Sequence, residues 1–251
     1  MKRLTLFALT LSFLFTQTPS SFAEKAAAKK PVAPKSAASK AAANTKVEKW
    51  TYDILFRGSK VGRMFRTETT YPSGKVVVKS NSASKIKIFF STYKGKMVST
   101  TVHEKGKLVK ADISGIQRNK PYSVKVVKTA KGLKVSVTKG KRTKTKVFAA
   151  KDYDATSAGL RLPMHPKGKK LTRRLLQLDQ LKIIKQKLTY RRYIKKKIGT
   201  KTHKFTEVRA RGARGKATML FTKQGWMRKM AVRISIFGSF EIKLRSHKVA
   251  S

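Results

Sequence analysis

The chain has no cysteine among its 251 residues. This absence excludes disulfide bonds, cysteine-ligated metal centres and lipid attachment to a cysteine. The four histidines, at positions 103, 165, 203 and 247, lie far apart and lack the paired spacing of metal ligands. We therefore expect neither a metal ion nor another cofactor.

Catalytic motifs are also missing. Ser157 stands in Ala-Thr-Ser-Ala-Gly, which lacks the first glycine of the Gly-x-Ser-x-Gly motif of hydrolases, and no glycine-rich phosphate loop precedes a helix. His103 is followed by Glu104, but neighbouring residues of a strand point to opposite faces. We expect no catalytic residue and a protein that is not an enzyme.

Acidic residues are scarce. The chain has 61 lysines and arginines against 11 acids, a formal net charge of +50, so few cations can have a carboxylate partner. Such a charge distribution attracts anionic partners. Lysine outnumbers arginine 44 to 17, and lysine acts as a point charge whereas arginine binds phosphates in a bidentate manner. This composition favours unspecific attraction over sequence-specific recognition.

The first 23 residues have the pattern of a secretory signal peptide. Lys2 and Arg3 precede the apolar run Leu4–Phe15, and small residues stand before the expected cleavage site at Glu24. The alternative is a membrane anchor, but the run is shorter than the roughly 20 apolar residues that span a bilayer. We expect a soluble protein in the periplasm or secreted from the cell.

Two further regions follow the signal peptide. Residues 24–45 consist mainly of Ala, Lys, Pro and Ser and predict a disordered tether, either a spacer or a cationic arm. Residues 46–251 have enough apolar residues for one basic globular domain. We expect this domain to be a monomer.

Strand patterns dominate that domain. Trp50, Tyr52, Ile54 and Phe56 alternate with more polar residues, and Arg57–Lys60 supplies a turn, which predicts a hairpin over residues 49–71. Further turns are predicted at 71–74, 94–96, 105–107, 130–132, 139–141, 212–215, 224–225 and 237–238. The pattern indicates a mainly β fold: a long, curved antiparallel meander, partly closed into a barrel or half-barrel, with lysines on one face.

The middle of the chain departs from this rhythm. Asp152 and Asp154 precede Ala155–Leu160, which predicts a short capped helical turn in a segment that crosses one end of the sheet and divides it into two halves. In Leu171–Leu188, three leucines fit a helical stripe, but the other apolar positions fit strands broken at Asp179-Gln180. We favour strands, because the hairpin rhythm resumes afterwards.

Three stretches of sequence carry a resemblance to a known group. They are W-T-Y-D-I-L-F-R-G-S-K-V-G near the start, D-Y-D-A-T-S-A-G-L-R-L-P in the middle and G-W-M-R-K-M-A-V-R-I-S-I-F-G-S-F-E-I-K-L near the end. Over about residues 50–244 the chain resembles exported bacterial domains of unknown function built on a curved antiparallel β-sheet. The resemblance implies a location in the bacterial cell envelope, and it supplies no catalytic or ligand residue.

Two cationic clusters are candidate anion-binding sites. The stretch R-A-R-G-A-R-G places Arg209, Arg211 and Arg214 beside a glycine-rich turn, whose backbone N–H groups also favour anions. The second cluster has cations close to Tyr190 and Tyr193, and its members are Arg173, Arg174, Arg191, Arg192, Lys195 and Lys196. The alternative for both clusters is a solvated hairpin end.

Three functions remain open. The first is a non-enzymatic cell-envelope protein that associates with anionic lipid headgroups, lipopolysaccharide or another polyanion through its lysine-rich surface. The second is a periplasmic carrier of lipid or lipoprotein with an apolar groove in the curved sheet. The third is an exported nucleic-acid-binding protein, which the charge favours but which no motif supports.

Overall fold

A computed structural model of the chain describes most of the predicted domain. The described residues are 45–88, 90–117, 119–157, 162, 164–198, 201–212, 215–223, 225, 227–234 and 238–250. The predicted signal peptide and the tether up to residue 44 lie outside the described residues. Among the described residues, no helix is long and apolar enough to cross a membrane.

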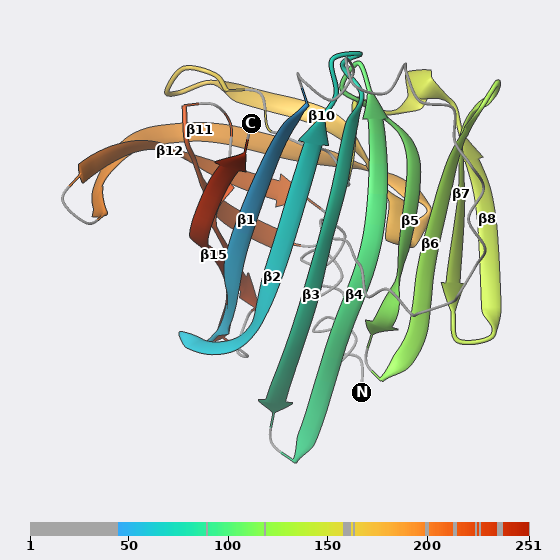
Figure 1. Cartoon of the computed structure of the whole chain (residues 1–251), viewed down its shortest axis with the longest axis horizontal. Coiled ribbons are helices and arrows are strands. Elements are labelled where there is room, and N and C mark those ends of the chain that lie inside the picture. Colours follow the sequence, from blue (N-terminus) through green and yellow to red (C-terminus); the bar gives the residue numbers. More distant parts are fainter. Residues whose placement is uncertain are drawn as a thin grey trace, which may run out of the picture.

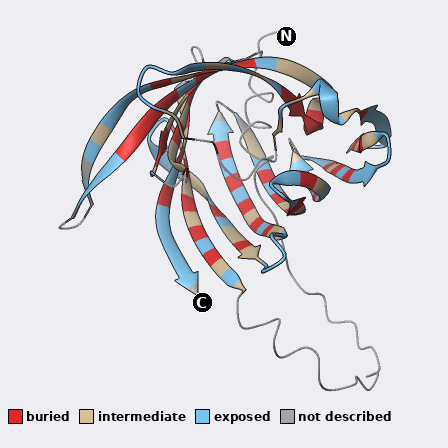
Figure 2. Cartoon of the chain, turned by 90° about the horizontal axis from the view of Figure 1, so that it is seen from above, coloured by how far each residue is buried: buried red, intermediate tan, exposed pale blue. Residues whose placement is uncertain are grey.

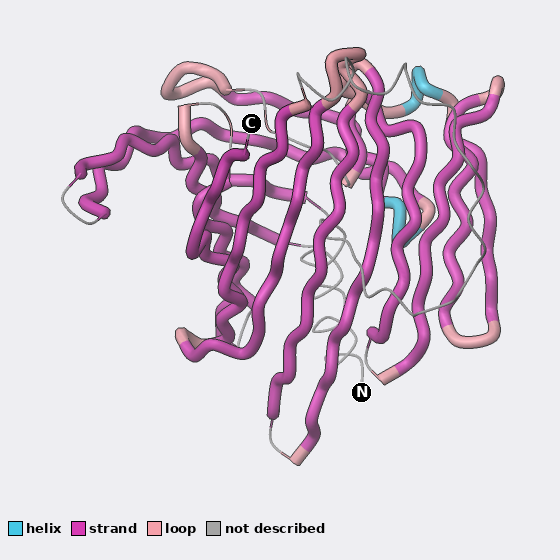
Figure 3. The backbone as a smooth tube through the Cα atoms, viewed as in Figure 1, coloured by secondary structure: helices cyan, strands magenta, loops and turns pink. Residues whose placement is uncertain are grey.

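The described chain forms one sheet of fifteen strands (Figure 1). The strands are β1 (Lys46–Phe56), β2 (Ser59–Thr70), β3 (Val76–Ile88), β4 (Ser91–Glu104), β5 (Lys107–Gln117), β6 (Lys120–Thr129), β7 (Gly132–Lys139), β8 (Arg142–Phe148), β9 (Ala155–Thr156), β10 (Lys170–Gln177), β11 (Lys182–Ile198), β12 (Lys201–Gly212), β13 (Gly215–Phe221), β14 (Met227–Ile234) and β15 (Gly238–Ala250). Two short 3-10 helices, η1 (Ala150–Asp152) and η2 (Leu178–Gln180), complete the fold (Figure 3).

The order of the strands confirms the predicted curved meander. The sheet runs from β8 back to β1, continues through β15 and ends at β9, and β8 and β9 are its two edges. Among the described strands, every neighbouring pair is antiparallel except β9 with β10. The sheet is therefore curved but not closed. The segment after β8 leads to the opposite edge and separates a first half, β1–β8, from a second half, β9–β15.

The first hairpin shows why the sequence forms these strands. Trp50, Tyr52, Ile54 and Phe56 are buried, while the residues between them are half-buried. Figure 2 shows a similar alternation along several strands. Phe56 pairs directly with Ser59, so the turn has two residues, Arg57 with φ 52° and Gly58 with φ 82°. Two positive φ angles define the type I′ turn that matches the twist of a hairpin.

The hydrophobic core joins the two halves of the sheet. In Figure 1 strands β1–β8 stand side by side, and β11 and β12 run across the picture behind them. Val135 of β7 and Leu178 of η2 belong to one cluster of buried residues, and η2 lies against β7. The rings of Phe56 and Phe240 lie 5.0 Å apart between centroids. Burial of these side chains from both halves supplies the main driving force for the curvature.

One predicted turn is wrong. Residues 94–96 lie inside β4, and the chain reverses direction next to Phe90 instead. Gly95 pairs with Ser84 on one side and with Gln117 on the other. These long-range pairings keep the backbone extended through a Lys-Gly-Lys triplet that has the local composition of a turn.

The middle segment is also different from the prediction. Ala155 and Thr156 form strand β9 instead of a helical turn, and residues 158–161 lie outside the described residues. The segment bonds to β10: the N–H of Asp154 donates to the carbonyl of Arg174, and that of Ser157 donates to the carbonyl of Leu176. Pairing with an existing strand satisfies these N–H groups without a local helix.

The interpretation of residues 171–188 as strands is confirmed. Strands β10 and β11 pair along their length and are separated by η2, which contains the predicted break at Asp179-Gln180. Leu181 closes this turn with φ 53°.

Candidate anion-binding surface

Exposed cations lie in register on the outer face of strands β10–β13. Lys187 pairs directly with Arg211, and Arg211 pairs with Lys216 on the next strand. Because directly paired residues share a face of the sheet, these side chains form one group. We call this group the outer cationic face, and its members are Arg174, Lys185, Lys187, Arg209, Arg211 and Lys216.

An open pocket of about 540 Å³ lies within this face. The long side chains of Arg209, Arg211 and Lys216 line it, and the remaining lining residues are small: Ala210, Ala217, Thr218, Ala231 and Ser239. Ala210 and Ala217 are buried and alternate with the cations, so the hollow lies beside the short side chains of Thr218, Ala231 and Ser239, with Arg209, Arg211 and Lys216 at its edge. None of these lining residues is acidic, so the pocket suits a phosphate or carboxylate group.

One buried carboxylate connects the two predicted clusters. Glu207 accepts a hydrogen bond from Nε of Arg192 at 3.0 Å, and its other oxygen lies 3.4 Å from Nε of Arg209. Arg192 is on β11 and Arg209 is on β12, so Glu207 fixes one guanidinium relative to the other. Within the described part of the chain, no carboxylate lies at ion-pair distance from Arg211 or Lys216.

Arg173 and Arg174 do not act together, contrary to their grouping in one predicted cluster. Arg174 is exposed, and its NH2 nitrogen donates to Asp154 at 2.9 Å, which holds the pKa of Asp154 below its usual range. Arg173 points to the opposite face, where its Nε donates to Gln186 at 2.8 Å and burial lowers its pKa. Adjacent strand residues alternate between faces, so only Arg174 belongs to the outer cationic face.

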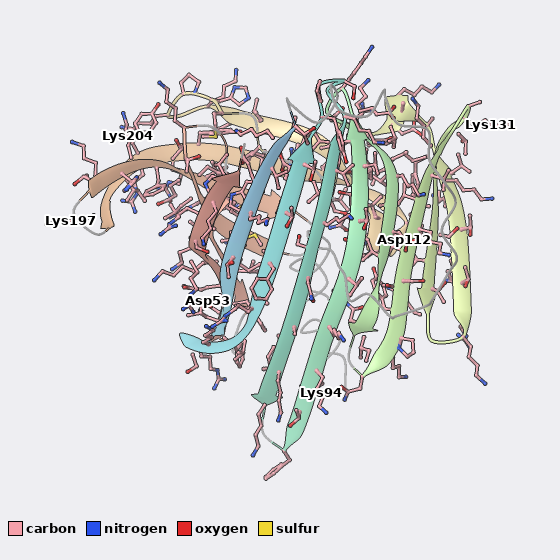
Figure 4. All side chains as sticks on the ribbon, viewed as in Figure 1. Asp53, Lys94, Asp112, Lys131, Lys197 and Lys204 are labelled. Atoms are coloured by element: carbon pink, nitrogen blue, oxygen red, sulfur yellow. The ribbon has the colours of Figure 1, made fainter. Side chains whose placement is uncertain are left out.

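The remaining cations of the second cluster follow β11 away from the pocket. Arg191 is the extra residue at a bulge between Tyr190 and Arg192. Further along, Lys195 pairs with Lys204, whose Nζ lies 4.1 Å from the ring centroid of Tyr193. Figure 4 shows Lys197 and Lys204 on the arm formed by β11 and β12. The side chain of Lys196 and the whole of Arg214 lie outside what the structure describes.

A group of buried charged residues on the inner face was not predicted. Glu48 and Glu68 pair directly across β1 and β2, and both are buried. Arg66 donates to Glu68 at 3.2 Å, Lys46 forms an ion pair with Glu48, and the ring of His247 also lies 3.5 Å from Glu48. Each carboxylate thus has a nearby cation. The signal was present in the sequence, because Glu48 and Glu68 fall in step with the inward-facing apolar positions of their strands.

Trp50 joins these charges on the same face. Its ring stacks on His247 with 5.0 Å between centroids, and the guanidinium of Arg66 lies 5.7 Å from its centroid. Such cation–π contacts stabilise a half-buried arginine. This inner group therefore uses its charges within the protein, in contrast to the outer cationic face.

His103 is buried beside the same group. Its Nε2 lies 3.2 Å from the hydroxyl of Thr101. Burial, and secondly the charge of Arg66, lower the pKa of His103 to about 4. Burial also raises the pKa of Tyr52, on β1, to about 12. In the described part of the chain, no group of three or more histidine and acidic side chains is arranged to hold a metal ion.

The comparisons with known proteins agree with the fold. No curated protein matches the sequence. The crystal structure of a beta-barrel-like protein of domain of unknown function DUF1849 from Brucella abortus is similar, with a TM-score of 0.55 and 10% identity. The match covers 82% of this chain and 98% of that chain, and at this identity it shows the fold alone.

A comparison with protein families confirms the resemblance to bacterial domains of unknown function on a curved sheet. The matched residues are nearly those over which the resemblance was expected. The family model matches residues 52–245. The chain therefore belongs to the family described as Domain of unknown function (DUF6134).

Proposed function

We propose that the protein is a non-enzymatic, exported cell-envelope protein that binds anionic lipid headgroups, lipopolysaccharide or another polyanion through its outer cationic face. The observation that carries this proposal is the open pocket lined by Arg209, Arg211 and Lys216 without a carboxylate. Among the described residues, Arg211 and Lys216 have no carboxylate at ion-pair distance, and Arg209 shares Glu207 with Arg192. The cations of the pocket therefore repel one another, and an anionic ligand relieves this repulsion.

The residues that line the pocket have the chemistry that binds a phosphate-bearing partner. Two arginines and one lysine line it, and arginine binds phosphate oxygens with two parallel hydrogen bonds. The proposed location in the periplasm or outside the cell supplies such partners as lipid headgroups and lipopolysaccharide, and the signal-peptide pattern supports this location.

The experiment compares a variant of the pocket with the unchanged protein. The variant combines Arg209→Gln, Arg211→Gln and Lys216→Gln. Binding is measured to vesicles with and without phosphatidylglycerol, to lipopolysaccharide and to duplex DNA at about 50 and about 500 mM salt, since each neutralised phosphate releases counterions. We expect about a hundredfold loss of affinity for the anionic vesicles at low salt, from about 1 kcal/mol per cation.

A matched control removes the same charge from the first half of the sheet. It combines Lys110→Gln, Lys125→Gln and Lys134→Gln, which are exposed on β5, β6 and β7. We expect only a few-fold loss for this control, because its lysines act on the ligand at long range.

Three outcomes would contradict the proposal. Equal losses in both variants would assign binding to the whole lysine surface. Lipid that stays bound at high salt would favour the carrier, because burial of acyl chains is hardly screened. Tight binding to DNA alone would favour the nucleic-acid binder.

A further inference from the structure

The hairpin of β3 and β4 extends beyond both of its neighbours. The pairing of β3 with β2 ends at Ser84, and the pairing of β4 with β5 ends at Gly95. Residues 85–88 and 91–94 pair only with each other. Four residues of strand extend about 13 Å. Figure 1 shows this hairpin reaching lower than the other strands.

Phe90, at the tip of this hairpin, has a fully exposed side chain. An aromatic side chain in water is unfavourable, and its burial in an apolar layer is stabilising. Lys85 and Lys87 on β3 and Lys94 on β4 are exposed behind the tip, and Lys85 pairs directly with Lys94. Figure 4 marks Lys94 on the lower part of this hairpin. An apolar tip with cations behind it matches the layers of an anionic bilayer.

The neighbouring turn holds the projecting hairpin in place. The Oδ1 atom of Asn119 accepts a hydrogen bond from the N–H of Lys94 at 3.3 Å, and its Nδ2 donates to the carbonyl of Thr92 at 3.4 Å. Asn119 has φ 62°, a conformation that asparagine tolerates better than most residues. These contacts brace the free edge of β4, so Phe90 is presented on a supported element.

We propose that this tip inserts Phe90 into the interface of an anionic lipid bilayer, with Lys85, Lys87 and Lys94 at the level of the headgroups. Interfacial segments bury their apolar face by about 5–10 Å, which the length of the projection allows. Duplex DNA would attract the three lysines, but it has no apolar layer for Phe90. The inference rests on the proposed binding to polyanions and selects the bilayer among them.

The test uses the full chain with Phe90→Ser and, as a matched control, Phe65→Ser. Phe65 is 48% exposed on β2, away from any hairpin tip. Partitioning is measured on vesicles of phosphatidylcholine with and without phosphatidylglycerol, and affinity is measured for duplex DNA. We expect Phe90→Ser to lower partitioning onto anionic vesicles at least tenfold and to leave DNA affinity unchanged. Phe65→Ser is expected to change neither, and thermal melting checks that both variants are folded.

A second variant reports the depth of insertion directly. Phe90→Trp should show a blue-shifted emission on anionic vesicles and quenching by brominated acyl chains. Partitioning of Phe90→Ser equal to that of the unchanged protein, without a blue shift in Phe90→Trp, would overturn this inference and leave the proposed function standing. Absence of binding by the unchanged protein to vesicles, lipopolysaccharide and DNA at low salt would overturn both.

Discussion

The two halves of the sheet carry similar charge in different ways. Residues 46–148 contain 21 lysines and 5 arginines, whereas residues 149–251 contain 17 lysines and 11 arginines. In the first half the exposed lysines are spread over regular strands, and in the second half two arginines of β12, Arg209 and Arg211, line a pocket. Lysine gives diffuse attraction, and arginine gives directional hydrogen bonds. Under the proposed function, the arginines of the second half make the directional contacts of the pocket, and the spread lysines of the first half add a general attraction for anions.

The buried carboxylates of the two halves differ as well. In the first half Glu48, Glu68 and Arg66 are turned inward, and the two carboxylates pair with Lys46 and Arg66. In the second half Glu207 is buried on the same face as Arg209, under the side chains of Arg192 and Arg209 that it pairs with. The buried carboxylates of the first half therefore pair with cations on the inner face, whereas Glu207 pairs with arginines of the outer face.

The largest expected loss of stability is that of a substitution in a turn of the second half, compared with the same substitution in a turn of the first half. Gly58 and Gly225 have φ 82° and 80°, a conformation that disfavours a β-branched residue. A Cβ at Gly58 would meet no atom within 4 Å, but at Gly225 it would lie 2.7 Å from the carbonyl oxygen of Leu162. We expect Gly58→Val to lower the free energy of unfolding by about 1 kcal/mol and Gly225→Val by about 3 kcal/mol. Urea unfolding measures both, and equal losses would contradict the close packing of the second turn.

Local patterns were sufficient for most of the fold. The alternation of buried residues from Trp50 to Phe56 and the Arg57-Gly58 turn predict the first hairpin, with strand ends within a few residues of those in the structure. The prediction of a turn from local composition was wrong at residues 94–96. The other Lys-Gly-Lys triplet, at residues 105–107, does form a turn. The difference is the pairing of Gly95 with Ser84 and Gln117, which depends on strands far away in the sequence.

A second test concerns the buried histidine of the first half. The pKa of His103 falls from 6.5 to about 4 because of burial and the nearby Arg66. Between pH 6.5 and about pH 4 this histidine binds more protons in the unfolded chain than in the folded protein. The stability of the fold therefore falls as the pH falls from about 6.5 to about 4. The total loss is about 3 kcal/mol, and it is absent above this range.

The measurement is urea unfolding at pH 7 and pH 4.5. We expect His103→Gln to lose less stability than the unchanged protein over this interval. His203→Gln, an exposed histidine in the second half, serves as the control and should follow the unchanged protein. A pH dependence that is identical in all three proteins would rule out His103 as the buried neutral group.

A smaller change, in the affinity for anionic ligands, is expected when Glu207 of the second half is replaced. Glu207→Gln removes the carboxylate that competes with an anionic ligand for Arg192 and Arg209. Affinity for anionic vesicles should rise about fivefold, while stability falls by less than about 1 kcal/mol because both arginines are well exposed. Asp112→Asn makes the same charge change in the first half and should have little effect on binding. Lower affinity of Glu207→Gln would instead show that this carboxylate is needed to position the arginines.

The candidate site was predictable only in part. The R-A-R-G-A-R-G stretch identified Arg209 and Arg211, because its signal is contiguous in the sequence. Lys187 and Lys216 join them through the register of β11 and β13, which no local pattern reports. The period of two along a strand could have separated Arg173 from Arg174 in advance.

The salt dependence of binding tests the central claim most directly. The logarithm of the association constant for an anionic ligand falls linearly with the logarithm of the salt concentration, with a slope of about 0.9 per phosphate contact on duplex DNA. If the outer cationic face makes the contacts, replacing Arg209, Arg211 and Lys216 by Gln should reduce the slope by about 2 to 3. The control triple at Lys110, Lys125 and Lys134 should change the slope by less than about 1. Equal reductions in both triples would contradict the claim, because they would show that the lysines of the first half contact the ligand as closely as the pocket of the second half does.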